Sequence, residues 1–526
     1  MKRFEHIHIF VFALSLTILD TGCTSSSSNK QVADDDDTDS IVGTNMDEST
    51  DSSQNGTDDT SVEISTDKEG KISYTVEKAE IGNQIFNDDT VLSYHLNFSD
   101  EALEELMDMS TLVDTVHFST NKDRYVPAHL SVEDTSIASV GVRFKGDWSI
   151  TSCAYTGQRV SRVEPVFGDI DVCQRFSLKL DINKYDDEAR LDGLKKINLH
   201  AMSTDPTKMH ERLGYSLFRE MDIVTPRAAH ARVYINGVYH GLFLAVEQVD
   251  GRFTANRYPE YGDGNLIKQV WPTEEVSETG VVEGLKTNDD DPSAIDVSGF
   301  MNFRDAIVTA NEAGNADTLS SYVDFDYLAR YIVVDRAITN FDGIFSFYGG
   351  DYGNHNYYWY QEEESGRFTL IPWDLDKVFM VPEPNFWFNN EPDSGSDYIP
   401  TCIPMNSPNW NVISSSCEAV TCSFDTLNLF TYQLTPLDCD PLLNLTRQQI
   451  YDSQAQIAEA FIAGPFSQER IENKVDTWKA QIITALDEDE LVDRAAVETA
   501  IDKLYEKIPA LQNNLAQMMS GLIEQE

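Results

Sequence analysis

The residues that could carry chemistry are two groups of aspartates in the C-terminal half of the chain. Asp342 lies in an Asn-Phe-Asp-Gly segment, and Asp374 and Asp376 end an Ile-Pro-Trp-Asp-Leu-Asp segment. The apolar run 368–371 predicts a strand that delivers the two later acids at its end, where carboxylates can hold a hard cation beside a phosphate. This pattern favours phosphoryl transfer, with turn-forming and capping aspartates as the alternative.

The order of the two acidic sites matches their order in a protein kinase. There, a catalytic-loop aspartate receives the substrate hydroxyl and a later aspartate holds magnesium. Asn356 could supply a neutral oxygen to a second metal ion, with an ordinary turn asparagine as the alternative. His355 is interpreted as a hydrogen-bonded structural histidine, because Asp342 is better placed to act as the base. The aromatic run 357–360 is predicted to be a core strand.

Upstream, a strand, a Gly-containing turn, a second strand and a capped helix follow one another as in the N-terminal lobe of a kinase. The second strand carries Lys179 and the helix carries Glu211, which we predict to form the ion pair that steadies the phosphates. A solvated strand lysine and a glutamate on the helix surface are the alternative. Lys145 lies in the Gly-bounded turn and competes for the phosphate-contacting role, and Arg143 precedes it as a further candidate nucleotide-binding residue.

Strands in the first half and helices in the second must position these groups. Apolar and polar residues alternate in segments bounded by Asp, Asn or Gly, which predicts strands over 91–96, 125–130, 137–144, 176–181, 231–235 and 241–246. Asn236-Gly237 separates the last two and is a strong hairpin signal. Asp205-Pro206 predicts a helix start with Asp as N-cap. Further helices are predicted over 325–339, 441–461, 467–486 and 491–523.

The N-terminus has the layout of a bacterial export signal. Two basic residues precede an apolar segment, 7–19, and Cys23 follows where a lipoprotein signal ends. We interpret 1–23 as the signal and Cys23 as the residue that becomes lipidated. Asp20 departs from the aliphatic residue usual in such signals, so cleavage without lipidation and a retained anchor are the alternatives. The apolar stretch is short for a membrane span.

An acidic, Ser-rich segment follows the signal. Residues 24–75 contain a serine run and four consecutive aspartates, and they offer few side chains that could be buried. We predict a disordered tether rather than a calcium site, because no EF-hand spacing is present. The formal net charge of the whole chain is -50. Such a charge argues against nucleic acid or an anionic membrane surface as a partner.

The six cysteines that remain after Cys23 form an even set in a chain expected to be exported. This favours disulfides, and proximity in sequence suggests one bridge between Cys153 and Cys173 and two within 402–439. Zinc is the alternative. Only one pair of these cysteines is close in sequence and no histidine lies near it, which disfavours a zinc site.

Taken together, these segments resemble the spore-coat CotH proteins, an atypical branch of the protein-kinase-like superfamily. The matching segments occur in the family's order and are 140–146, 179–181, 193–199, 234–241, 340–342 and 371–376. The resemblance runs from about residue 85 to near the C-terminus. It rests on the ordered set, since no single segment is specific. The family's Gly-turn usually continues with Asn and Ser, where this chain has Asp147 and Trp148.

The resemblance implies a secreted or surface-anchored kinase that uses ATP with Mg²⁺ or Mn²⁺ to phosphorylate Ser or Thr of an extracytoplasmic protein. Carried over residue by residue, Asp342 matches the catalytic-loop aspartate, and Asp374 or Asp376 matches the metal aspartate. Lys179 and Glu211 match the phosphate-contacting lysine and its partner.

We therefore expect an α+β fold of the atypical protein-kinase-like type with two lobes. The strand-rich N-lobe spans 76–260, and the mainly helical C-lobe spans 261–526 with a Cys-rich insertion at about 383–440. The expected partner is an extracytoplasmic protein, with no nucleic acid and with membrane contact only through a lipid anchor. Two rival functions use the same residues: a non-catalytic coat or adhesion protein on a kinase-derived fold, and a metal-dependent hydrolase.

Overall fold

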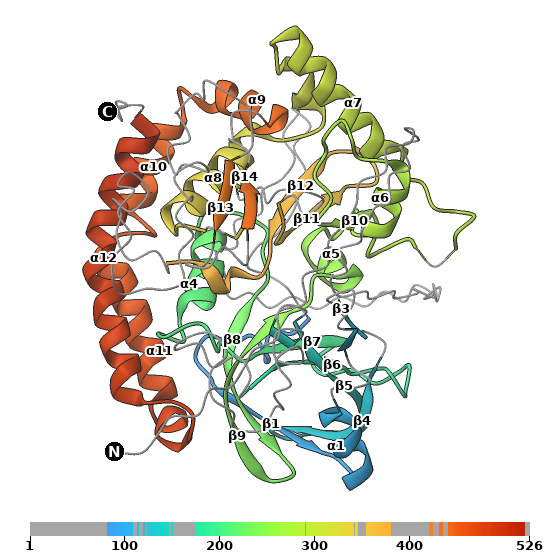
Figure 1. The fold of residues 1–526 in the computed structure, drawn as a ribbon, viewed down its shortest axis with the longest axis vertical. Helices are drawn as coiled ribbons and strands as arrows, with labels where there is room; N and C mark the ends of the chain where they lie inside the picture. Colours follow the sequence, from blue (N-terminus) through green and yellow to red (C-terminus); the bar gives the residue numbers. More distant parts are fainter. Residues whose placement is uncertain are drawn as a thin grey trace, which may run out of the picture. The chain divides into compact units, whose positions relative to one another are not determined.

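The fold is described by a computed structural model of the chain (Figure 1). The structure describes residues 81–108, 113–114, 119–121, 124–146, 149–150, 175–289, 291–340, 342–345, 354–379, 420–423, 431–434 and 440–520. Strands and helices are both abundant in these ranges, which confirms the α+β class. The predicted signal, the predicted tether and most of the Cys-rich segment lie outside the described residues.

Seven strands of the described residues close into a barrel in the order β1-β4-β5-β6-β7-β9-β8. Neighbouring strands are antiparallel except β1 and β8, which pair in parallel and close the ring. The barrel strands are β1 (Leu92–Asn97), β4 (Val126–Val132), β5 (Thr135–Lys145), β6 (Ser177–Asp181), β7 (Lys196–His200), β8 (Ala228–Ile235) and β9 (Val238–Glu247). The six strands predicted in this half are confirmed, whereas β7 was missed.

The barrel wall has two unlike faces because successive side chains of a strand point to opposite sides. Leu178 and Leu180 of β6 belong to a hydrophobic cluster to which every barrel strand contributes. Lys179 lies between them on the other face, in one cross-strand row with Arg143 of β5 and Asn198 of β7. All three side chains of this row are buried. The outer face of the barrel therefore needs polar partners from the rest of the chain.

The hairpin between β8 and β9 confirms the predicted turn. Asn236 and Gly237 both have positive φ angles, 48° and 79°. A two-residue turn of this kind needs left-handed backbone at both positions, which Asn and Gly tolerate best.

A second hydrophobic cluster joins a three-stranded antiparallel sheet to most of the helices. The sheet has the order β10-β11-β12, with β10 (Asn265–Lys268), β11 (Tyr357–Gln361) and β12 (Phe368–Pro372). Strand β11 is buried along almost all of its length, as predicted for the aromatic run. The remaining strands are β2 (Val113–Asp114), β3 (Ser119–Thr120), β13 (Val420–Ser423) and β14 (Thr431–Leu434).

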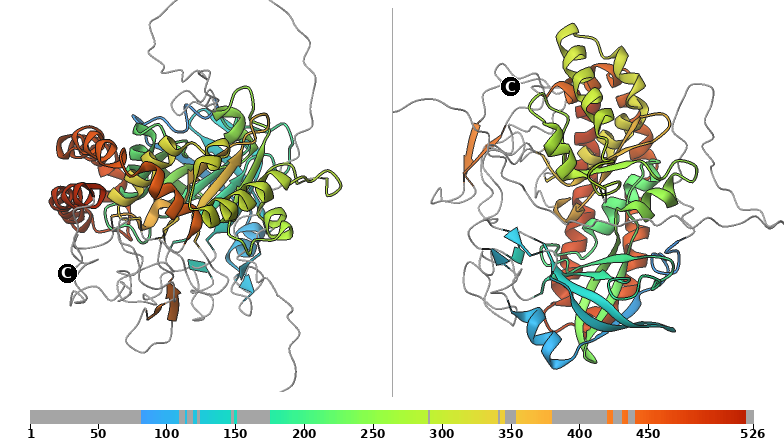
Figure 2. Two further views of the ribbon diagram at one scale, coloured as in Figure 1. Left: turned by 90° about the horizontal axis from the view of Figure 1, so that it is seen from above. Right: turned by 90° about the vertical axis from the view of Figure 1, so that its right-hand side faces the viewer.

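The helices of the described residues include two long ones near the C-terminus, α11 and α12, which pack side by side (Figure 2). Helix α11 also contacts β9 of the barrel. None of the helices in the described part of the chain combines the length and the apolarity that a membrane span requires. The helices are α1 (Asp100–Met107), α4 (His210–Glu220), α5 (Gly251–Arg257), α6 (Glu278–Gly284), α7 (Ser298–Ala313), η1 (Asp317–Ser321), α8 (Phe325–Ala337), η2 (Leu375–Lys377), α9 (Pro441–Ile450), α10 (Gln454–Ala463), α11 (Gln468–Glu488) and α12 (Arg494–Ser520).

The start predicted for α4 is wrong. The helix begins at His210 rather than at Asp205-Pro206. The Asp205 carboxylate accepts from the backbone N–H of Thr207 and from that of His210, both at 2.8 Å, and Lys208 between them has a φ of 60°. Asp205 thus closes a turn that interrupts the helical path, and it satisfies a donor of the first helical turn from outside the helix.

Candidate active site

The acids predicted at the end of β12 lie on a short turn that α4 supports. Asp374 has left-handed backbone with a φ of 52° and precedes η2. Its backbone N–H donates to the hydroxyl oxygen of Tyr215 on α4 at 3.0 Å. Leu375 is buried against Gly214 of the same helix. The strand end delivers the acids as the sequence predicts, and α4 determines where the turn lies.

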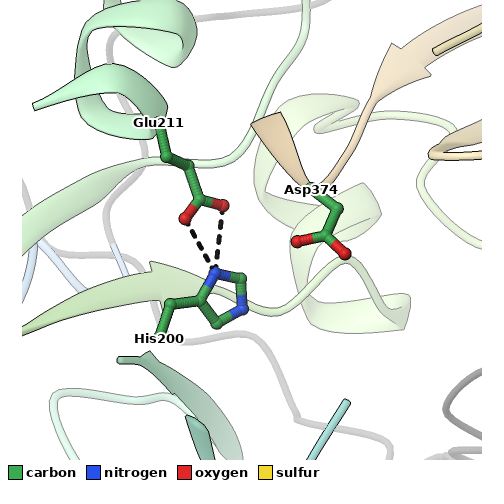
Figure 3. A group of neighbouring side chains, drawn as sticks. All are labelled: His200, Glu211 and Asp374. Atoms are coloured by element: carbon green, nitrogen blue, oxygen red, sulfur yellow. Dashed lines mark hydrogen bonds and ion pairs between the residues drawn. The ribbon is translucent and has the colours of Figure 1, made fainter. Parts of the chain in front are cut away.

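His200, Glu211 and Asp374 converge from β7, α4 and the turn after β12 (Figure 3). Nδ1 of His200 lies 3.0 Å and 2.8 Å from the two carboxylate oxygens of Glu211. One potential ligand atom of each of the three residues lies within 4.8 Å of the others. His200 and Glu211 are buried, whereas Asp374 is partly exposed. The group has the composition and spacing to hold a metal ion.

His200 was not among the predicted site residues. The signal lies in β7, where Lys196, Asn198 and His200 alternate with Ile197 and Leu199 and all five are buried. A buried strand with a polar side chain at every second position has one face that contacts polar groups. This alternation could have indicated a functional face without any family resemblance.

Asp376 lies beside these residues and has an altered acidity. Thr204 donates its hydroxyl to the Asp376 carboxylate at 3.1 Å, and Lys377 Nζ lies 3.5 Å from it. Although 32% of the side chain remains exposed, burial raises the pKa of Asp376 to about 6. This raised value also includes the opposing charge of Lys377 and the negative charges of Asp374, Glu211 and Asp342, which raise the pKa. Four carboxylates from three segments, α4, the loop with Asp342 and the turn after β12, thus interact electrostatically.

Asp342 is held by the two residues predicted to lie near it. His355 Nε2 lies 2.9 Å from one carboxylate oxygen of Asp342. The amide of Asn356 donates to the other oxygen at 3.1 Å and to the backbone carbonyl of Asp342 at 2.8 Å. Asn356 also has a φ of 63°, so it has the turn conformation of the alternative interpretation as well. His355 orients the acid, in agreement with its predicted structural role.

A buried ion pair at the end of α8 anchors the segment that carries Asp342. Arg336 Nη2 lies 2.6 Å from a carboxylate oxygen of Asp335, and the amide of Asn340 donates to the other oxygen at 2.8 Å. Asn340 in turn accepts from the backbone N–H of Asp342 at 3.4 Å. The catalytic-loop candidate is therefore tied to the helix that precedes it.

Two lysines of the barrel were predicted to contact the phosphates. Lys179 is fully buried, which rules out the alternative of a solvated strand lysine. Lys145 Nζ lies 5.3 Å from the ring centroid of Trp373, the residue before Asp374. Glu211 contacts His200, and the predicted ion pair of Glu211 with Lys179 stays a prediction.

The predicted roles of Arg143 and of the cysteines stay predictions. Arg143 donates to the backbone carbonyl of Phe144 at 3.1 Å and lies over the ring of Tyr125, so these contacts belong to the barrel wall, and its role toward a nucleotide stays a prediction. The lipidation of Cys23 and the predicted disulfides concern residues whose side chains lie outside the described part of the chain.

The fold and the acids of the two loops are those of a kinase-like protein, as the family match supports. The chain belongs to the CotH kinase protein family, whose sequence profile matches residues 142–517. This match confirms the resemblance and supports a kinase-like fold; it begins within β5, so residues 85–141 lie outside it.

A relative, the inner spore coat protein H of Bacillus subtilis (strain 168), is 27% identical over 230 residues. The similar region covers 40% of this chain and 59% of the relative, which is less than two thirds of the relative's own length.

Proposed function

We propose that the chain is an exported protein kinase that transfers the γ-phosphate of ATP to Ser or Thr of an extracytoplasmic protein. The observation that carries this proposal is the gathering of carboxylates: Glu211 and Asp374 offer ligand atoms within 4.8 Å of each other, and Asp376 lies on the same turn as Asp374. Carboxylates gathered in this way repel one another unless a cation lies between them. A divalent ion bound with ATP is such a cation, which connects the acid cluster to phosphoryl transfer.

The residues present fit ATP with Mg²⁺ or Mn²⁺. Asp374, Asp376 and the side-chain oxygen of Asn356 form the oxygen donor set that these hard ions prefer, and they would hold the metal. Lys179, with Lys145 as a second candidate, would steady the phosphates. When bound, the nucleotide supplies the phosphoryl group and the metal neutralises its charge.

Asp342 has the role of receiving the proton of the attacking hydroxyl. His355 and Asn356 each contact its carboxylate, so the acid is oriented before substrate arrives. Such preorganisation avoids the cost of arranging the group during the reaction. The anchor formed by Asp335 and Asn340 maintains this orientation.

In this proposal the barrel half, 76–260, serves as the N-lobe and 261–526 as the C-lobe, with nucleotide between them. The chain is exported and attached through a lipid at Cys23 or released. Support for a surface location comes from the relative, which is named as a coat protein. The same name favours a second candidate function, a structural coat protein that binds partners without catalysis.

Phosphate transfer from labelled ATP tests the proposal. The purified protein is incubated with γ-labelled ATP and Mn²⁺ or Mg²⁺, alone and with casein or a Ser-rich peptide, beside Asp342→Asn and Asp374→Ala. Label on protein is expected for the parent and is expected to fall by at least about a hundredfold in both variants. Asp305→Asn changes an exposed acid of α7 and serves as the control.

Two results would contradict the kinase. Full activity of Asp342→Asn removes the assignment of the base. No label on protein together with no thermal shift on adding nucleotide favours the structural coat protein, and free phosphate without labelled protein favours a hydrolase.

A further inference from the structure

We propose that His200 and Asp374, with Glu211 behind the imidazole, form a binding site for a divalent transition-metal ion that the protein takes up without nucleotide. This site shares Asp374 with the proposed kinase function, but its ligand nitrogen sets it apart from the all-oxygen set of Asp374, Asp376 and Asn356. The proposal rests on geometry, on hydrogen-bond satisfaction and on ligand chemistry.

The geometry of the three residues is close to that of a metal site. Ligand atoms around one ion lie about 3 to 4.4 Å apart when each is about 2.0 to 2.2 Å from the metal. The three residues offer one ligand atom each within 4.8 Å of the others. Figure 3 shows Nδ1 of the His200 ring toward Glu211 and the Asp374 carboxylate beside them, facing the same space.

The second observation concerns the other ring nitrogen of His200. Nε2 is buried and has no hydrogen-bond partner among the described residues, and the residue is 5% exposed. The hydrogen bonds to Glu211 place the proton of a neutral imidazole on Nδ1, which leaves a lone pair on Nε2. A buried acceptor without a donor is unfavourable, and a metal ion satisfies that lone pair.

The arrangement of Glu211 and His200 matches the carboxylate–histidine–metal pattern. A carboxylate that accepts from the far nitrogen fixes the tautomer and makes the coordinating nitrogen more basic. Glu211 is held in place, since it lies on the first turn of α4 and is buried. Its negative charge and that of Asp374 also balance a divalent cation.

The ligand types determine which ion binds. Imidazole nitrogen suits the later first-row transition metals, whereas Mg²⁺ prefers oxygen ligands and retains its waters. We therefore expect Co²⁺ and Zn²⁺ to bind at least about tenfold more tightly than Mg²⁺ in the absence of ATP.

Cobalt absorption tests the site directly. The tag-free protein is stripped with chelator and titrated with Co²⁺, and the visible ligand-field band is recorded with Zn²⁺ and Mg²⁺ as competitors. His200→Asn retains an amide near the position of Nδ1, which can still contact Glu211, but it removes Nε2. We expect this variant to bind Co²⁺ at least about tenfold more weakly and to lose the nitrogen contribution to the band.

Two further variants complete the design. Asp374→Asn is expected to weaken Co²⁺ binding strongly, and Glu211→Gln only several-fold, because the amide oxygen still accepts from Nδ1. His240→Asn, which changes a half-buried histidine on β9, is the matched control and is expected to bind as the parent does. Thermal unfolding is measured for each variant, so that loss of binding is compared only between folded proteins.

The proposal is overturned if His200→Asn binds Co²⁺ like the parent, or if Mg²⁺ displaces Co²⁺ at equal concentration. If His200→Asn fails to fold, the competition of Zn²⁺ and Mg²⁺ with Co²⁺ on the parent protein tests the site by itself. Because no ATP is present, the result is independent of kinase activity. If the protein binds Co²⁺ but transfers no phosphate, the metal site is retained and the kinase function is rejected. If it transfers phosphate but His200→Asn binds Co²⁺ like the parent, the kinase function is retained and the metal site is rejected.

Discussion

His230 shows how one buried side chain links the stability of this protein to pH. It lies between Arg212, whose Nη1 is 2.8 Å from Nδ1, and the carbonyl of Lys208, which accepts from Nε2 at 2.7 Å. Burial, and after it the charge of Arg212, lower the pKa of His230 to about 3. A histidine of the unfolded chain titrates near 6.5. The folded protein therefore binds fewer protons than the unfolded chain over this interval.

We predict that the free energy of unfolding is unaffected by His230 above about pH 6.5 and falls as the pH decreases toward 3. The contribution of this residue to the slope approaches about 1.4 kcal/mol per pH unit. Urea unfolding between pH 4.5 and 7.5 measures it, and His230→Gln is expected to show a shallower dependence. His95→Gln, which changes a half-buried histidine on β1, is the control. Equal slopes for His230→Gln and the parent would contradict the prediction.

Only some residues of the candidate site could be predicted from the sequence. Asp342, Asp374 and Asp376 could be predicted because their local segments have a recognisable order. His200 and Tyr215 could not be found in this way, since their importance comes from contacts across the sheet and with the turn after β12. Sequence order gives the candidates, while contacts between distant segments define the site.

At the scale of elements, helix α4 supports the acidic turn through a glycine. A Cβ at Gly214 would lie 3.1 Å from Cδ1 of Leu375, closer than comfortable packing allows. Leu375 separates Asp374 and Asp376. A methyl group at this position therefore presses on the turn that carries both acids.

We predict that Gly214→Ala lowers metal affinity several-fold while the melting temperature stays the same or rises. Alanine favours the helix by about 1 kcal/mol over glycine, which offsets the cost of moving Leu375. Gly280→Ala on α6 is the matched control, because its added Cβ would lie at an ordinary 3.6 Å from the Ser277 hydroxyl. Calorimetric titration with Mn²⁺ beside thermal unfolding checks both halves of the prediction, and an unchanged metal affinity in Gly214→Ala would refute it.

Most elements could be predicted from periodicity, and the exceptions have physical causes. The strands before and after Asn236-Gly237 and the last two helices follow from alternation and helical spacing, whereas the single helix predicted over 441–461 is wrong, because α9 ends at Ile450 and α10 begins at Gln454. The start of α4 could not be predicted in this way, because the Asp205 carboxylate closes a turn where a simple N-cap was expected. Strand β7 was missed although its polar and apolar residues alternate, as they do in the strands that were predicted. The parallel pairing of β1 with β8 depends on long-range packing, which no local pattern contains.

At the scale of the whole described fold, a buried ion pair connects the barrel to the C-terminal helices. Arg175, just before β6, contacts both carboxylate oxygens of Asp489 at 2.8 Å and 2.6 Å. Asp489 also accepts from the backbone N–H of Leu242 on β9 at 3.1 Å, and it directly follows α11. One carboxylate thus joins three segments that are far apart in the sequence.

We predict that Asp489→Ala destabilises the protein by about 3 to 5 kcal/mol, because it leaves the Arg175 guanidinium buried without its counter-charge. Asp487→Ala is the matched control. Its carboxylate pairs with Arg494 at an exposed position, so the expected loss is about 0.5 kcal/mol or less. Guanidinium-induced unfolding of both variants measures the difference, and similar stabilities would show that the pair contributes little.

The pairing of β1 with β8 also governs the order in which the chain can fold as it is synthesised. Strand β1 is complete at Asn97, but the strand that closes the ring beside it ends only at Ile235. Until then β4 can pair with one edge of β1, but the other edge stays open and the apolar interior is incomplete, a state prone to aggregation. The open edge of β1 must therefore be kept apart from other chains until its second partner, β8, has been synthesised.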